Sequence, residues 1–178
     1  LPVWNRNMHH STCRELLLYT TQALLLAVKY HRLRAYDYCL AWSTVPAGAI
    51  ALVLHRVFLL PYSVWVSGPD IPGFERRYRY IYPLLSPLIR SVWRHATPVI
   101  AKCAGEIELI KAVDDSIEVT FIPNGVDLSV FRPGPGTPDK GQLHVVCVAR
   151  LIERKGQHYL IDAVKRIVDS GIDVILSL

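Results

Sequence analysis

Hydrophobic and polar positions along the chain follow two periods, one typical of amphipathic helices and one typical of buried strands. Leucine and valine recur at helical spacing between residues 16 and 28, and short apolar runs rich in β-branched residues follow at intervals. The pattern predicts helices at residues 12–34, 47–58, 74–96, 105–113 and 157–169, and strands at residues 38–42, 62–66, 99–103, 119–122, 143–149 and 173–178. Such alternation indicates an α/β fold with a parallel sheet covered on both faces.

Local signals set the expected ends of these elements. Ser11-Thr12 can cap the first helix, with Glu15 in its first turn. Pro83 and Pro87 are expected to break the helical region 74–96, because proline removes a backbone donor. Residues 123–125, Pro-Asn-Gly, are typical of a turn that closes the strand before them.

The most informative segment is VVCVARLIERKG, residues 145–156. An apolar run ends at Arg150, and Lys155-Gly156 precede the apolar stripe of the next helix. Ligands of open α/β sheets bind beyond the carboxyl ends of strands, where a helix N-terminus supplies free N–H groups. Arg150 and Lys155 would add two cations there. The residues therefore predict a phosphate or diphosphate site; the alternative is an ordinary surface arginine and a lysine at a helix start.

A single low-complexity stretch, RPGPGTPDKG at residues 132–141, divides the chain. Its proline and glycine content is typical of a linker between domains. We therefore expect an N-terminal α/β domain at residues 1–133, a linker at 134–142, and the beginning of a second α/β domain at 143–178.

Composition excludes several classes of protein. With 51% hydrophobic and 20% charged residues in 178, the chain is not disordered. Its four cysteines show no C-x-x-C spacing, which favours reduced thiols and a cytoplasmic location. The most hydrophobic window, residues 47–66, is interrupted by His55-Arg56 and Pro61, so no membrane span is predicted. The histidines lack ligand-type spacing, and no metal site or cofactor is expected.

Positive charge is concentrated in residues 74–94, where five arginines face only Glu75 and tyrosines are interleaved. Such a segment could contact an anionic membrane from the inner face of the cell, as a peripheral attachment. An ordinary helix with a solvated arginine face is the alternative. Nucleic acid is the least favoured partner, and none is expected.

Four segments in order resemble the retaining glycosyltransferases of family 4, which have the GT-B fold. They are Ile122 to Asp127 (IPNGVD), Phe131 to Pro133 (FRP), Ala149 to Leu151 (ARL) and Lys155-Gly156. The upstream loop SGPDIPGF, residues 67–74, and the strand before Gly105-Glu106 are similar to family segments as well. The match runs from about Asp37 to the end of the chain.

The resemblance implies two Rossmann-like, doubly wound domains, both incomplete in this chain. It implies that Arg150 and Lys155 contact the donor diphosphate, that Asn124, Gly125 and Asp127 shape the cleft at the hinge, and that Gly68 and Gly73 belong to an acceptor-side loop. Asp70 is the candidate catalytic carboxylate. Each has a structural alternative: a turn at Asn124-Gly125, a cap at Asp127, a tight turn at Gly68 and a loop carboxylate at Asp70.

The implied reaction moves a sugar from a nucleotide-diphosphate sugar to a hydroxyl of a carbohydrate or lipid-linked acceptor, with retention. Ser67 stands where many relatives carry His or Arg, and Cys103 where a serine is common. The family's paired glutamates would lie beyond Leu178, so the chain is expected to be a central piece that is inactive alone. Two other readings stay open: a non-catalytic nucleotide-sugar or polyanion binding module at a membrane surface, and another doubly wound enzyme such as an epimerase.

Overall fold

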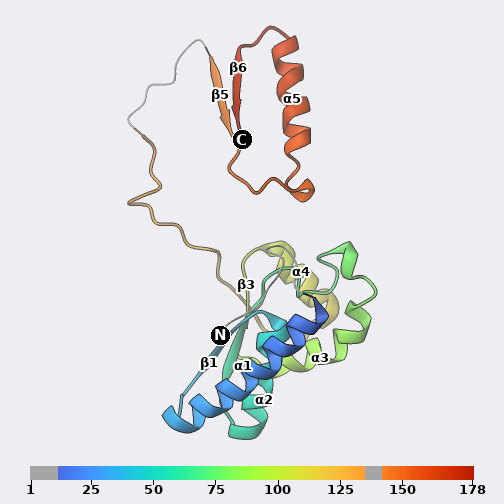
Figure 1. Cartoon of the computed structure of the whole chain (residues 1–178), viewed down its shortest axis with the longest axis vertical. Coiled ribbons are helices and arrows are strands. Elements are labelled where there is room, and N and C mark those ends of the chain that lie inside the picture. The colour runs from blue at the N-terminus through green and yellow to red at the C-terminus, as the bar shows by residue number, and fades with distance from the viewer. Residues whose placement is uncertain (1–11, 135–141) are drawn as a thin grey trace. The chain divides into compact units, whose positions relative to one another are not determined.

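The computed structural model describes residues 12–134 and 142–178 (Figure 1). The chain divides into two compact units, Leu1–Gly125 and Val126–Leu178. Most of the expected linker, residues 135–141, lies outside the described residues, and so do residues 1–11. Each unit is therefore described by itself.

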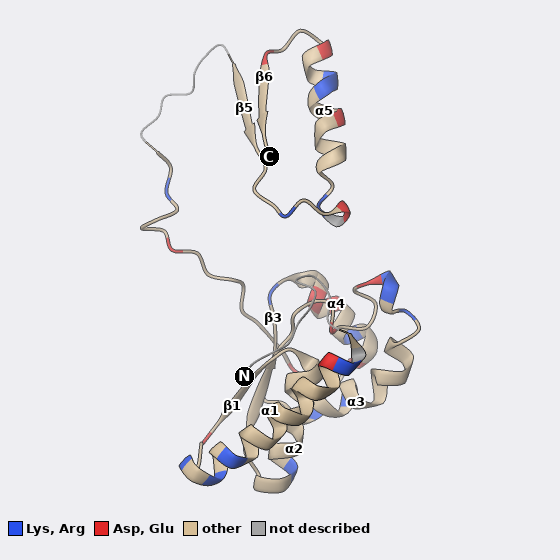
Figure 2. Cartoon of the chain, viewed as in Figure 1, with Lys and Arg blue, Asp and Glu red and all other residues tan. Residues whose placement is uncertain are grey.

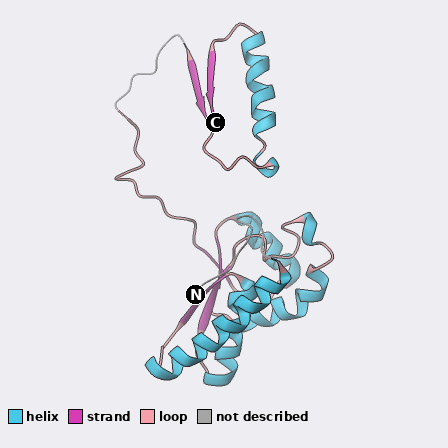
Figure 3. Cartoon of the chain, viewed as in Figure 1, coloured by secondary structure: helices cyan, strands magenta, loops and turns pink. Residues whose placement is uncertain are grey.

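The first unit is built on four parallel strands in the order β1-β2-β3-β4. The strands are β1 Cys39–Trp42, β2 Tyr62–Trp65, β3 Val99–Ala101 and β4 Val119–Phe121. α1 (Cys13–Arg34) precedes β1, and α2 (Ala49–Phe58), α3 (Tyr82–His95) and α4 (Ala104–Val113) connect successive strands. Buried side chains of these three connecting helices join those of the sheet in one core cluster (Figures 1 and 3). The predicted α/β fold with a parallel sheet is confirmed.

Sequence signals explain where α1 begins. The Thr12 hydroxyl accepts a hydrogen bond from the Glu15 N–H at 3.3 Å, and the Glu15 carboxylate accepts one from the Thr12 N–H at 2.7 Å. This reciprocal capping box satisfies two of the N–H groups that a helix start leaves unpaired. The helix ends at Ala35, whose backbone is left-handed.

The core of the first unit lies between the sheet and α2 to α4. Val64 and Val99 pair in register at its centre and are fully buried. Polar atoms carried into this core have partners: the Trp93 indole N–H donates to the Thr44 hydroxyl at 3.0 Å, and the Tyr62 hydroxyl donates to the Val92 carbonyl at 2.6 Å. Burial raises the pKa of Tyr62 far above its ordinary value.

The expected break of the helical region 74–96 is wrong at Pro87, whereas regular α-helix begins only at Tyr82, next to Pro83. Pro83 lies in the first helical turn, where its missing N–H would have no partner in any case. Pro87 lies inside the helix, which continues to His95, because the buried side chains of Ile89 and Trp93 hold the following turns against the core. The residues before α3 form a separate 3-10 turn, Arg76–Tyr78.

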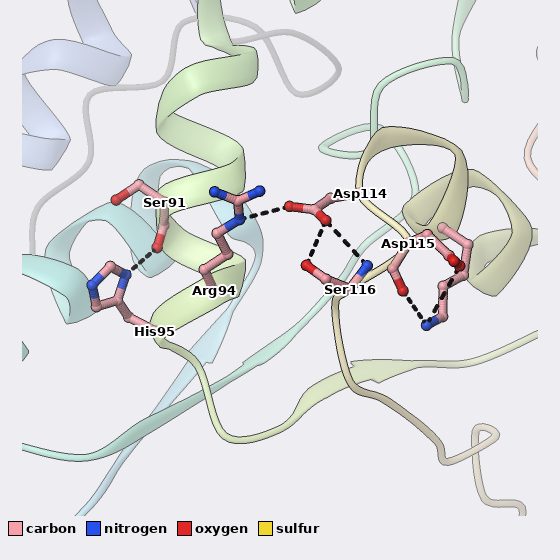
Figure 4. Close-up of polar contacts among 7 residues, drawn as sticks. Ser91, Arg94, His95, Asp114, Asp115 and Ser116 are labelled. Atoms are coloured by element: carbon pink, nitrogen blue, oxygen red, sulfur yellow. Dashed lines mark hydrogen bonds and ion pairs between the residues drawn. The ribbon is translucent and has the colours of Figure 1, made fainter.

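A polar cluster ties the end of α3 to the end of α4 (Figure 4). Arg94 donates to the Asp114 carboxylate at 2.7 Å, and the Ser116 hydroxyl and N–H donate to its other oxygen. The hydrogen bond from Ser116, followed by that from Arg94, lowers the pKa of Asp114 below its ordinary value. Stability from this contact is therefore present at neutral pH and is lost as the pH falls through the lowered pKa.

The second unit is a β-α-β element. β5 (Leu143–Val146) pairs in parallel with β6 (Val174–Ser177), and α5 (Gln157–Asp169) connects them after the 3-10 turn Glu153–Lys155. α5 has the predicted bounds, and Gly171 ends it with a positive φ of 89°. All fully buried hydrophobic side chains of the described residues lie in the first unit. The second unit leaves Val148 and Leu151 94% and 78% exposed.

Candidate functional site

The carboxyl end of β5 is held against the start of α5. After β5 the Cys147 N–H still pairs with the Ser177 carbonyl, and the chain then turns away from the sheet. Gln157, the first residue of α5, is buried and donates from its side-chain amide to the Arg150 carbonyl at 2.8 Å. This contact fixes the backbone of Arg150 beside the helix N-terminus. The sequence did not single out Gln157, because its role depends on a carbonyl seven residues earlier.

Lys155 is the last residue of the 3-10 turn that precedes α5. The turn closes with hydrogen bonds from the Lys155 N–H to the Ile152 carbonyl and from the Gly156 N–H to the Glu153 carbonyl. Gly156 has a positive φ of 69°, which redirects the chain into the helix. Both cationic side chains, Arg150 and Lys155, are exposed, and neither forms a hydrogen bond or ion pair with another described residue.

The arrangement is suited to an anion. Two unpaired cations and a helix N-terminus lie in one short loop, and lysine before a helix start is electrostatically unfavourable unless an anion is present. Among the residues described, no group of three or more His, Cys, Asp or Glu side chains could hold a metal ion. The assignment of Arg150 and Lys155 to a diphosphate site stays a prediction. It is supported by the exposure of both side chains and by their lack of partners among the described residues.

Asp70 links two loops at the carboxyl edge of the first sheet. Its Oδ1 accepts a hydrogen bond from the Ser67 N–H at 2.8 Å, and its Oδ2 accepts one from the N–H of Thr44, a fully buried residue after β1. Both carboxylate oxygens therefore have backbone partners. The geometry supports the structural alternative for Asp70, and its catalytic role stays a prediction.

We expect Asp70→Ala to lower the free energy of unfolding by about 2 to 3 kcal/mol, because two backbone N–H groups would lose a charged acceptor. Urea unfolding followed by circular dichroism measures this loss. Asp115→Ala is the matched control, since the Asp115 side chain is 94% exposed. An Asp70→Ala variant as stable as the wild type would contradict the structural role.

Gly68 and Gly73 have positive φ values of 84° and 90°. The Phe74 ring lies over Gly68, and an added Cβ would come within 2.7 Å of that ring. A side chain at this position would have to displace the Phe74 ring, which is 42% exposed, and the positive φ is what favours glycine there. A Cβ at Gly73 would meet Leu109 at 3.2 Å, so the loop also packs against α4. Their assignment to an acceptor-side loop stays a prediction.

The Asn124-Gly125 segment is not the turn that the sequence indicates. Neither residue has a positive φ, and the turn lies farther along, at residues 128–130. There the Asp127 carboxylate accepts hydrogen bonds from the Ser129 hydroxyl at 2.6 Å and N–H at 2.9 Å, which lower the pKa of Asp127. Asp127 thus caps the turn that follows it. Asn124 and Gly125 are exposed, and their contribution to a hinge or cleft stays a prediction.

Sequence reasoning missed a buried ion pair at the carboxyl end of β3. The Lys102 ammonium lies 2.9 Å from Oε1 of Glu106 and donates to the Val66 carbonyl at 2.8 Å. Oε2 of Glu106 accepts from the Lys102 N–H at 2.8 Å, and the glutamate side chain is only 4% exposed. The pair therefore joins the ends of β2 and β3. Its only signal in the sequence is a lysine and a glutamate four residues apart after an apolar run.

None of the helices within residues 12–134 and 142–178 combines the length and hydrophobicity that a membrane crossing requires.

No family model matches the chain. The chain is 26% identical over 132 residues to the putative colanic acid biosynthesis glycosyltransferase WcaL of Escherichia coli K12. That similarity covers 71% of this chain and 31% of the relative, so the chain spans about a third of the relative's length.

Proposed function

We propose that this chain is part of a glycosyltransferase that moves a sugar from a nucleotide-diphosphate sugar to a hydroxyl acceptor. The observation that carries the proposal is the loop between β5 and α5. There the Arg150 carbonyl is fixed by Gln157, and the side chains of Arg150 and Lys155 have no partner among the described residues. Similarity to a glycosyltransferase supports the same class of reaction.

In this proposal Arg150 and Lys155 bind the donor diphosphate and also stabilise the transition state of the transfer. Transfer of the sugar leaves a nucleoside diphosphate, and negative charge grows on the departing oxygen in the transition state. A guanidinium and an ammonium held beside that oxygen lower the barrier, because they meet the charge as it develops. The planar guanidinium of Arg150 would donate hydrogen bonds to two diphosphate oxygens. The Lys155 ammonium would supply a single positive charge on a flexible side chain.

The finer features follow the family resemblance. We assign the donor to the second unit and the acceptor to the first, within a GT-B arrangement, and transfer with retention. The acceptor would be a carbohydrate or a lipid-linked sugar, and the name of the relative places that protein in colanic acid biosynthesis. The reaction would take place in the cytoplasm, and no cofactor or metal is assigned to it.

Nucleoside-diphosphate binding tests the proposal. In the complete protein, we expect a nucleoside diphosphate to raise the midpoint of thermal unfolding, because a ligand that binds only the folded state stabilises it by mass action. The matching nucleoside without phosphates should leave the midpoint unchanged. A panel of uridine, guanosine, adenosine and cytidine diphosphates that shifts nothing would contradict the proposal.

A further inference from the structure

The segment before α3 carries cations that the fold does not neutralise. Figure 2 shows blue and red segments along the loop and turn that lead into α3. Arg77 is paired with Glu75 at 2.6 Å, and farther along Arg94 is paired with Asp114. Arg76 and Arg79 are exposed and have no ion pair with any described residue. Positive charge therefore remains at this turn.

Arg76 and Arg79 line a groove. The groove has a volume of about 410 Å³ and also contains Tyr82 and Ser86 of α3 and the chain at Pro72 and Gly73. Its floor is fixed, because the Tyr82 hydroxyl donates to the Pro69 carbonyl at 3.0 Å and accepts from the Glu75 N–H at 3.4 Å. Glu75 and Pro83 line the groove as well, and the Glu75 carboxylate is paired with Arg77, so Arg76 and Arg79 are the cations at its rim that an anion such as a phosphate group can contact.

Exposed apolar side chains follow Arg79 along the chain. Tyr80, Ile81, Leu84 and Leu88 are 76%, 46%, 81% and 38% exposed. The last three recur at the helical spacing i, i+3 and i+7, so they form a stripe that the first unit leaves uncovered. The Arg79 guanidinium lies 4.5 Å from the centre of the Tyr80 ring, which joins the cationic and apolar parts.

We infer that residues 76–88 form a membrane-binding surface that attaches the protein to an anionic phospholipid bilayer. Arg76, Arg77 and Arg79 contact lipid phosphates. Leu84 and Leu88 enter the boundary between headgroups and acyl chains, and Tyr80 lies at headgroup level. Aromatic rings and aliphatic side chains beside arginines are the composition of peripheral membrane attachments. Because the arginines of this segment are positively charged, an anionic bilayer is favoured over a neutral one.

Vesicle flotation of the whole chain tests this inference. We expect binding to vesicles containing phosphatidylglycerol, weak binding to phosphatidylcholine vesicles, and a loss of binding as salt rises. The triple variant Arg76→Gln/Arg77→Gln/Arg79→Gln should bind on the order of 100-fold more weakly, because each arginine near an anionic surface contributes roughly fivefold. The variant Leu84→Ser should weaken binding by about tenfold at constant charge.

The matched control removes three exposed cations elsewhere in the first unit: Arg14→Gln/Lys29→Gln/Arg34→Gln on α1. It lowers net charge equally, so it should retain most of the binding if residues 76–88 form the contact. Circular dichroism verifies that each variant is folded, and Leu84→Ser keeps the test decisive if the arginine variant does not fold. Equal binding by Leu84→Ser and wild type, equal losses in the two triple variants, or preference for single-stranded RNA over vesicles would each overturn the inference.

Discussion

Replacing Arg150 and Lys155 with alanine should lower kcat/KM of the complete protein by at least roughly 10³-fold. Each cation is placed where charge develops on the leaving diphosphate, and loss of one such contact typically costs 10²- to 10³-fold. The single variants should each show part of the effect, with kcat falling more than KM rises, since the charge is greatest in the transition state. Steady-state transfer assays over a range of donor concentrations measure both constants.

The fold should survive these substitutions. Both side chains are exposed and without partners among the described residues, so their loss removes no packing. Arg166→Ala is the matched control, because Arg166 is an exposed arginine in the last turn of α5, away from the loop. Its kinetics should equal those of the wild type. Wild-type kinetics in the Arg150→Ala/Lys155→Ala variant would remove the assignment of the diphosphate site.

The second large effect concerns stability. We expect Glu106→Gln to lower the free energy of unfolding by about 3 kcal/mol, because it leaves the Lys102 ammonium largely buried without its counter-charge. The side chain of Lys102 is 24% exposed and that of Glu106 is 4% exposed. Urea unfolding monitored by circular dichroism gives the value, provided that the slope with urea concentration is unchanged.

A double variant separates the ion pair from the rest of the contact. In Lys102→Met/Glu106→Gln the amide oxygen can still accept from the backbone N–H of position 102, and no charge is left unpaired. We expect it to recover most of the lost stability. Asp115→Asn is the matched control, because its pair with Lys111 is exposed, spans 3.8 Å and has the same spacing. Such a pair contributes about 0.5 kcal/mol. A Glu106→Gln effect no larger than that of the control would contradict the role of the buried pair.

Regular elements with one strong pattern were predictable. The α5 bounds follow from an apolar stripe that starts after Gly156 and stops before Gly171, and the structure confirms them. The central strands β2 and β3 were predictable because they are short, mostly apolar runs, as expected for buried strands of a parallel sheet; Ser63 is the one polar residue in them. In these cases the local sequence was sufficient to predict the type of element and its position, since residues close in sequence determine both.

Contacts between distant residues were not predictable. Pro87 is tolerated in α3 because the buried side chains of Ile89 and Trp93 hold the helix against the core. A rule based only on the residues next to a proline does not include such packing. Asn124-Gly125 has the composition of a turn but an unturned backbone, and the capped turn follows at Asp127 instead. Asp70 accepts from the N–H of Thr44, 26 residues earlier, and Lys102 donates to the Val66 carbonyl, 36 residues earlier. The parallel sheet brings these loop ends together, so both contacts appear only in three dimensions.

The most direct measurement is a crystal structure of the complete protein with a bound nucleoside diphosphate. The guanidinium of Arg150 and the ammonium of Lys155 should both lie at hydrogen-bond distance, about 2.7 to 3.2 Å, from diphosphate oxygens beyond the carboxyl end of β5. A nucleotide bound elsewhere, with both side chains still directed into solvent, would contradict the account.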